Sequence, residues 1–267
     1  MVEAHFKRIL FKREFIVPFL STFLVLFIWE ISSRTGIIST YFFPPPTLIG
    51  ESLIKIGGKG DLFHHTLVTL YRLFLAFLMA AIPGVAIGLA MGLWRSVRSM
   101  VDPIVLLLYP IPSVAFLPMV MLYFGFGDLS LLITSAITPF FLITVNTMAG
   151  VSHLEKVILE AGKNYGASGW RLFCKVILPG TLPYIFTGFR LGLGIALIVV
   201  IAVELVAAKM GLGSMLWTCW QIFKIEEMYC GLIFIGLMGL FFTYGLSWLA
   251  DFLMPWQKDI LKQKGMK

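Results

Sequence analysis

Three ionisable side chains stand inside long apolar runs of the sequence, where charge is expensive to place. Arg72 lies near the start of the run 67–93, while Arg190 and Glu204 both lie in the run 182–206. In hydrocarbon such groups face a protein partner or a water-filled path, so each is a candidate for function. Arg72 could line such a path, where its positive charge would attract anions. Glu204 could contact a molecule in the path or a partner protein, or it could fix a helix by a hydrogen bond.

The longest connection between apolar runs, residues 151–181, is far more polar than its surroundings. It contains two series of apolar residues at helical spacing, 157–165 and 170–177, and Gly166 and Gly169 interrupt the pattern between them. The pattern predicts two short amphipathic helices that are joined at a glycine. The chain then turns back into an apolar run.

This connection fits the pattern E-A-A-x3-G-x9-I-x-L-P at Glu160, Ala161, Gly162, Gly166, Val176, Leu178 and Pro179. In this respect the chain resembles the permeases of binding-protein-dependent ABC importers. Gly162 replaces an alanine and Val176 an isoleucine, so both departures keep a small or aliphatic side chain. In that family the loop carries a coupling helix that docks in a groove on the ATPase subunit. The resemblance therefore implies that the matching residues couple this chain to an ATPase.

The resemblance extends over residues 43–255 and is strongest to the branch for nitrate, sulfonate and taurine. The residues that carry it are 43–46, 66–72, Pro110-Ile111-Pro112 with Pro118, 123–127, 202–205 and Gly211-Leu212-Gly213. It implies an all-α integral membrane protein with the type I importer permease (MetI-like) fold. Such a permease works as a dimer, expected here to be of two identical copies. ATP and magnesium are bound by a separate ATPase subunit, and an extracytoplasmic binding protein delivers the solute. We expect a small, anionic solute such as a sulfonate, nitrate or taurine.

Composition alone also indicates a membrane protein, because 59% of the residues are hydrophobic and 13% are charged, against about 25% charged in soluble domains. A helix needs about 20 mainly apolar residues to cross the hydrocarbon. Six runs qualify: 15–31, 67–93, 103–124, 129–150, 182–206 and 228–249. Prolines within several of them predict kinked helices.

We expect these spans to form a single transmembrane permease domain over residues 1–267. Residues 1–63 hold the first span and an outer loop, residues 64–255 hold the core, and residues 256–267 form a basic tail. The first run resembles a secretory signal, but no small-x-small cleavage site follows it, so we interpret it as a retained span.

Orientation follows from the distribution of basic residues, which are commoner in cytoplasmic loops. With the N-terminus inside, the cytoplasmic segments hold Lys7, Arg8, Lys12, Arg13, Arg95, Arg98, Lys156, Lys163, Arg171, Lys175, Lys258, Lys262, Lys264 and Lys267. The outer segments hold only Arg34, Lys55, Lys59, Lys209 and Lys224. The sequence therefore predicts a multi-pass protein of the bacterial inner membrane, with both termini cytoplasmic and lipid around its spans.

Several functions lack their motifs. The chain has no G-x-x-x-x-G-K-[ST] phosphate loop, so we expect it to bind no cofactor itself. It has no H-E-x-x-H or G-x-S-x-G pattern, its three cysteines have no metal-ligand spacing, and its basic clusters do not form a nucleic-acid stripe. Two alternatives stay open for the protein: an ion-coupled secondary transporter, and a membrane-embedded enzyme or assembly scaffold. For the connection 151–181, the alternative is an amphipathic helix that merely lies on the lipid headgroups.

Overall fold

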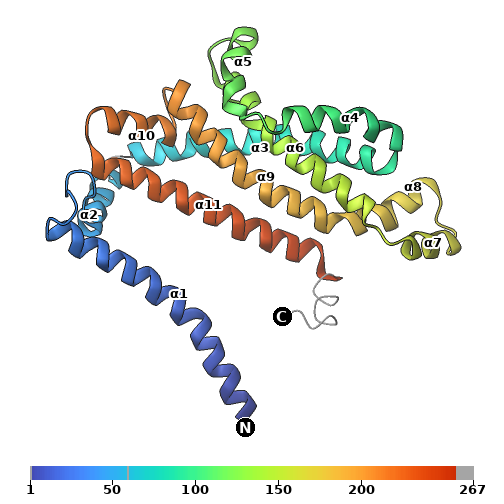
Figure 1. Cartoon of the computed structure of the whole chain (residues 1–267), viewed down its shortest axis with the longest axis horizontal. Helices are drawn as coiled ribbons and strands as arrows, with labels where there is room; N and C mark the ends of the chain where they lie inside the picture. The colour runs from blue at the N-terminus through green and yellow to red at the C-terminus, as the bar shows by residue number, and fades with distance from the viewer. Residues whose placement is uncertain (1, 59, 257–267) are drawn as a thin grey trace. The chain divides into compact units, whose positions relative to one another are not determined.

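The computed structural model describes residues 2–58 and 60–256, with side chains described for Val17 and from Phe19 onward. Every regular element in that part of the chain is helical, as the fold class predicted (Figure 1). The α-helices are α1 (Val2–Arg34), α2 (Pro46–Gly57), α3 (Asp61–Leu93), α4 (Arg95–Leu108), α5 (Leu117–Phe124), α6 (Asp128–Ser152), α7 (Lys156–Asn164), α8 (Gly169–Leu172), α9 (Leu178–Ala207), α10 (Leu212–Gln221) and α11 (Ile225–Leu253). A 3-10 turn over Ser113–Phe116 and a π-helical turn over Phe173–Ile177 complete them.

The helices divide into two compact units. The first comprises the chain up to residue 63 together with 216–233, and the second comprises 64–215 together with the chain from 234 on. In the first unit, Glu30 near the end of α1 accepts hydrogen bonds from the hydroxyl and the backbone N–H of Thr47 on α2. The second unit holds every candidate site residue that the sequence analysis named.

Four helices in the described part of the chain are long and apolar enough to cross a bilayer: α3, α6, the continuous helix Gly169–Ala207, and α11. The first expected span, 15–31, lies within α1, and the side chains of its residues 15, 16 and 18 lie outside those described. The basic tail after residue 256 also lies outside the described residues.

The third expected span, 103–124, is not the single kinked helix that the sequence predicted. Instead α4 and the segment Ser113–Phe124 meet at 91°, so they form either one broken span or a re-entrant loop. The break falls at Pro110 and Pro112. Each proline lacks an N–H and blocks the carbonyl one turn earlier, and two of them in close succession stop the helix rather than bend it.

Helix α6 is the packing centre of the second unit, and it contacts α3 through a row of glycines. A Cβ atom on Gly88 would lie 2.5 Å from the carbonyl oxygen of Thr144, and one on Gly92 would lie 2.4 Å from Val151. Gly84, one turn earlier, faces Ile143 in the same way. Because lipid tails are as apolar as leucine, helices in membranes associate by such close approach of small residues.

The opposite side of α6 packs against α9 by the same device. Gly188 and Gly192 of α9 both lie against Ile143, and Gly150 of α6 lies against Tyr184. Ile143 has no exposed surface, because glycines of α3 and α9 close on it from both sides. Helix α6 is therefore held between α3 and α9, and these three helices fix the positions of the site residues.

We expect Gly88→Val to destabilise the protein by about 1–3 kcal/mol, because any side chain there forces α3 away from the α6 backbone. The free energy of unfolding in detergent micelles, followed by circular dichroism, measures the loss. Ala86→Val is the matched control, because Ala86 is exposed on the same helix. Equal stability of the two variants would contradict this packing.

Candidate functional site

Arg72 and Glu204, the two charged path candidates, form a buried ion pair. Arg72 is 5% exposed and Glu204 is 0% exposed. Nη1 of Arg72, on α3, donates to Oε1 of Glu204, in the last turn of α9, at 2.8 Å. The same nitrogen also donates to the backbone carbonyl of Met210. The structure thus brings together two residues that are far apart in the sequence.

Asp128 is a third member of this cluster, and the sequence analysis missed it. Its Oδ1 accepts hydrogen bonds from Nε and Nη2 of Arg72, at 3.0 and 2.7 Å. Asp128 is the first residue of α6 and is about half exposed. An acidic residue in a first helical turn is a common helix-start signal, so its type and position gave no reason to pair it with Arg72.

The carboxylate of Glu204 has neutral partners as well as its charged one. The hydroxyl of Thr69 lies 2.9 and 3.1 Å from its two oxygens, and the backbone N–H of Gly213 donates to Oε2 at 3.0 Å. Thr69 in turn accepts a hydrogen bond from the backbone N–H of Leu212 at 2.8 Å. A buried carboxylate needs this many donors, because each lone pair without one adds to the cost of leaving water.

Two glycines let the backbone approach this carboxylate. A Cβ atom on Gly211 would lie 2.3 Å from Oε1 of Glu204, and Gly211 has a φ of +123°, which disfavours other residues. A Cβ atom on Gly213 would lie 2.4 Å from the carbonyl oxygen of Ile201. The Gly-Leu-Gly sequence is therefore a requirement of the cluster. The imidazole of His65 adds a contact, with Nδ1 2.8 Å from the Gly211 carbonyl oxygen.

The Arg72 cluster, comprising Arg72, Glu204, Asp128 and Thr69, joins α3, α6, α9 and the start of α10. Each guanidinium nitrogen of Arg72 already donates to a protein acceptor, and the cluster contains one cation and two carboxylates. This arrangement supports a positioning role, which the sequence analysis left open for Glu204. A role of either residue in the translocation path stays a prediction. Arg190 lies elsewhere on α9, where it donates to the hydroxyl of Ser247 on α11.

The second candidate region is the connection 151–181, where α7 ends two residues before Gly166. Gly166 has a φ of +79°, which is the left-handed conformation that ends many helices. Its N–H donates to the Lys163 carbonyl, and the N–H of Ala167 donates to the Gly162 carbonyl. These two bonds form a Schellman motif, so the glycine of the sequence pattern is where α7 stops.

Two positions at which the chain departs from the family pattern contact each other. A Cβ atom on Gly162 would lie 3.0 Å from a methyl carbon of Val176 and 3.2 Å from a methyl carbon of Leu172. Helix α7 therefore packs closely on the helical segment that follows it, because Gly162 has no side chain to hold the two apart. The smaller residue at each position lets the two segments come close.

The second short helix that the sequence predicted is not separate. Helix α8 passes through the π-helical turn Phe173–Ile177 directly into α9, which begins at Leu178. Pro179 explains the wider turn, because its ring would clash with the carbonyl of Lys175 in regular α-helix and it has no N–H to donate. Leu178 and Pro179 are half-buried in this continuous helix.

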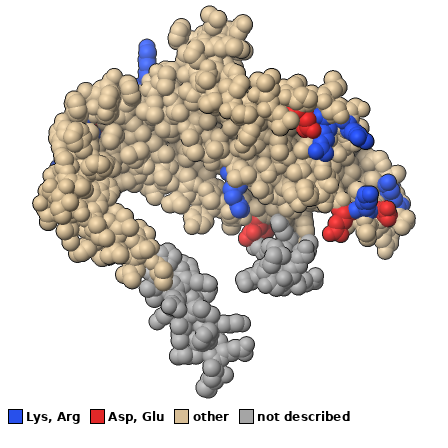
Figure 2. Space-filling view, in the orientation of Figure 1, with Lys and Arg blue, Asp and Glu red and all other residues tan. Residues whose placement is uncertain are grey.

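Helix α7 exposes much of its surface. Glu160 and Ala161 are exposed, as are Val157 (71%) and Tyr165 (93%). In Figure 1, α7 and α8 lie beyond the ends of α6 and α9. Figure 2 shows charged side chains gathered at this end of the second unit. The exposed basic residues there are Arg95, Arg98, Lys156, Lys163, Arg171 and Lys175.

Replacing Arg72 by glutamine should lower the free energy of unfolding by about 3–5 kcal/mol, because it leaves the Glu204 carboxylate buried without its counter-charge. Chemical unfolding in mixed micelles measures the change. Arg190→Gln is the control, since Arg190 is exposed and makes a single hydrogen bond to a hydroxyl.

The double variant Arg72→Met, Glu204→Leu should recover much of that stability, because a buried ion pair can be replaced by apolar side chains at small cost. If Arg72→Gln is no more harmful than Arg190→Gln, the ion pair does not hold the helices together.

Comparison with known proteins agrees with this architecture. Residues 82–259 match the family described as binding-protein-dependent transport system inner membrane component. The taurine transport system permease protein TauC of Escherichia coli is 33% identical over 88% of this chain and 88% of its own length. The bicarbonate transport system permease protein CmpB of a Synechocystis species is 29% identical over 87% of this chain and 86% of its own.

A solved structure shows the same fold. A chain of the MetNI methionine ABC transporter, in inward-facing conformations, superimposes with a TM-score of 0.54 at 17% identity, over 69% of this chain and 94% of that one. The resemblance noted in the sequence is thus confirmed for both fold and family. The chain belongs to the inner membrane components of binding-protein-dependent transport systems, as an ABC transporter permease similar to those for taurine, sulfonates and bicarbonate.

Proposed function

We propose that this permease forms the path for a small, anionic solute and is driven by a separate ATPase subunit that docks on the connection 151–181. The proposal rests on the structure of α7, on its packing and on the side chains that it exposes. It ends in a left-handed glycine, packs through Gly162 on the next helix, and presents Glu160 with exposed apolar side chains. A short, rigid, exposed amphipathic helix of this kind suits a groove on a partner protein.

The solute class is supported by the relatives. One is named for taurine, which carries a sulfonate group, and another for bicarbonate. We therefore propose a sulfonate, nitrate, taurine or similar solute, delivered by an extracytoplasmic binding protein. Closure of the ATPase subunits on ATP would draw the connections of two permease copies together and switch the helices between inward-open and outward-open forms.

We further propose that the connection faces the cytoplasm of a bacterial cell, with both termini on that side. Basic side chains are exposed at the end of the second unit that carries α7, and the rule that cytoplasmic loops are rich in Lys and Arg supports this orientation. ATP and magnesium would then bind to the partner subunit, in the compartment that contains ATP. Two identical permease copies with surrounding lipid complete the proposed assembly.

Co-purification from the native host in mild detergent tests the docking. The variant Glu160→Lys, Val157→Asp changes two exposed side chains of α7, so it should fold normally and lose the ATPase subunit that accompanies the native chain. The matched control is Glu51→Lys, Ile54→Asp, which makes the same substitutions at exposed positions of α2. This control should keep the ATPase.

Recovery of the native chain without any ATPase, with or without nucleotide, would remove the basis for an ATP-driven importer. An ion-coupled secondary transporter would then be the leading alternative. Retention of the ATPase by the α7 variant would show that docking uses another surface.

A further inference from the structure

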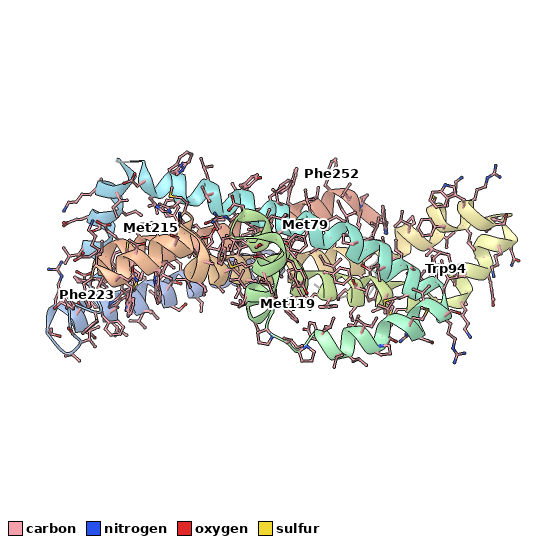
Figure 3. The ribbon with its side chains drawn as sticks, turned by 90° about the horizontal axis from the view of Figure 1, so that it is seen from above. Met79, Trp94, Met119, Met215, Phe223 and Phe252 are labelled. Atoms are coloured by element: carbon pink, nitrogen blue, oxygen red, sulfur yellow. The ribbon has the colours of Figure 1, made fainter. Side chains whose placement is uncertain are left out.

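A cavity of about 480 Å³ lies between the end of α3 and the start of the helix Gly169–Ala207. Its lining is apolar and aromatic, from Leu89, Leu93, Trp94, Trp170, Phe173 and Ile177. Figure 3 shows Trp94 at the end of α3 that lies beside α8. The volume falls in the range of pockets that hold small organic ligands, about 300–1,000 Å³.

On each wall of this cavity, an arginine directly follows a lining tryptophan in the sequence. Arg95 directly follows Trp94, and Arg171 directly follows Trp170. Both arginines are exposed, and neither forms an ion pair within residues 17–58 and 60–256. Arg98, by contrast, is paired with Asp102 at 3.2 Å. Each wall therefore has an exposed arginine next to a lining tryptophan, and neither arginine is ion-paired with a carboxylate of the described residues.

The depth of the cavity in the bilayer follows from helix length. The helix Gly169–Ala207 has 39 residues, which at about 1.5 Å per residue is nearly twice the hydrocarbon thickness of about 30 Å. Arg171 and Lys175 both lie in its first turns, and because basic side chains favour the headgroup layer, we infer that this end projects into the headgroups. Tryptophan and arginine side by side are typical of that interfacial layer.

We propose that this cavity binds an anionic phospholipid of the cytoplasmic leaflet, with an acyl chain against the tryptophans and the phosphate between Arg95 and Arg171. Charge complementarity favours an anionic lipid over a zwitterionic one, and the interfacial depth favours a lipid over a soluble ligand. The choice of leaflet rests on the proposed orientation, whereas binding itself does not. A lipid there would bridge α3 to the helix that carries α8, next to the connection proposed to dock the ATPase.

Native mass spectrometry of the full chain in detergent tests the site. Dioleoyl phosphatidylglycerol should bind more tightly than dioleoyl phosphatidylcholine. The variant Arg95→Gln, Arg171→Gln should weaken phosphatidylglycerol binding by about fivefold for each arginine. Lys55→Gln, Lys209→Gln removes the same charge from exposed positions on other elements, and it should leave binding unchanged.

A second variant distinguishes lipid binding in the cavity from attraction of lipid by surface charge alone. Ala86 lines the cavity and is exposed, so Ala86→Trp should fill the space and reduce lipid binding while both arginines remain. Equal binding of the two lipids, equal loss in the two charge variants, or full binding by Ala86→Trp would each overturn the proposal. Lipid that is released whenever two copies of the chain associate would assign the cavity to the second copy instead. None of these outcomes bears on ATPase docking, which is measured separately.

Discussion

A carboxylate with no exposed surface determines the arrangement of one end of the second unit. Glu204 must find donors within the protein, because an unpaired charge in a medium of low dielectric is among the most costly groups to bury. Arg72, Thr69 and the backbone N–H of Gly213 supply those donors. The cluster brings α3, α6 and α9 together and sets the path of the chain into α10.

At the opposite end of the same helices, few side chains are tied together by hydrogen bonds and many are exposed. There α7 is held by backbone hydrogen bonds at a glycine and by one small-residue contact, and much of its surface is exposed. Between the two ends, glycines of α3 and α9 close on α6 without any charged group. One end is therefore held by hydrogen bonds within the protein, whereas at the other end α7 leaves many side chains exposed.

Local signals in the sequence predicted much of this. Four of the six apolar runs coincide with described helices that are long enough to cross a bilayer, and the spacing around Gly166 located α7 and its end. Arg72 and Glu204 were each singled out because charge in an apolar run is costly. Their pairing was not predictable, because helix spacing relates only residues of one segment and these two lie on different helices.

Other features depended on tertiary context. Asp128 stands outside any apolar run, so only the folded chain shows that it faces Arg72. The break between α4 and α5 needed the combined effect of two prolines, and one proline usually only kinks a helix. The continuous helix through Pro179 needed a π-helical turn, which no simple periodicity reveals.

In the proposed orientation, the end that holds the Arg72 cluster faces outward, and the end that carries α7 faces the cytoplasm, where an ATPase can reach it. Cys174 is exposed in the connection, whereas Cys219 and Cys230 are buried, so a membrane-impermeant maleimide can report on one native side chain. We predict that Cys174 is labelled in inverted vesicles and protected in spheroplasts, and that Lys209→Cys shows the reverse. Labelling of Cys174 from outside the cell would place the connection on the side without ATP and would contradict the account.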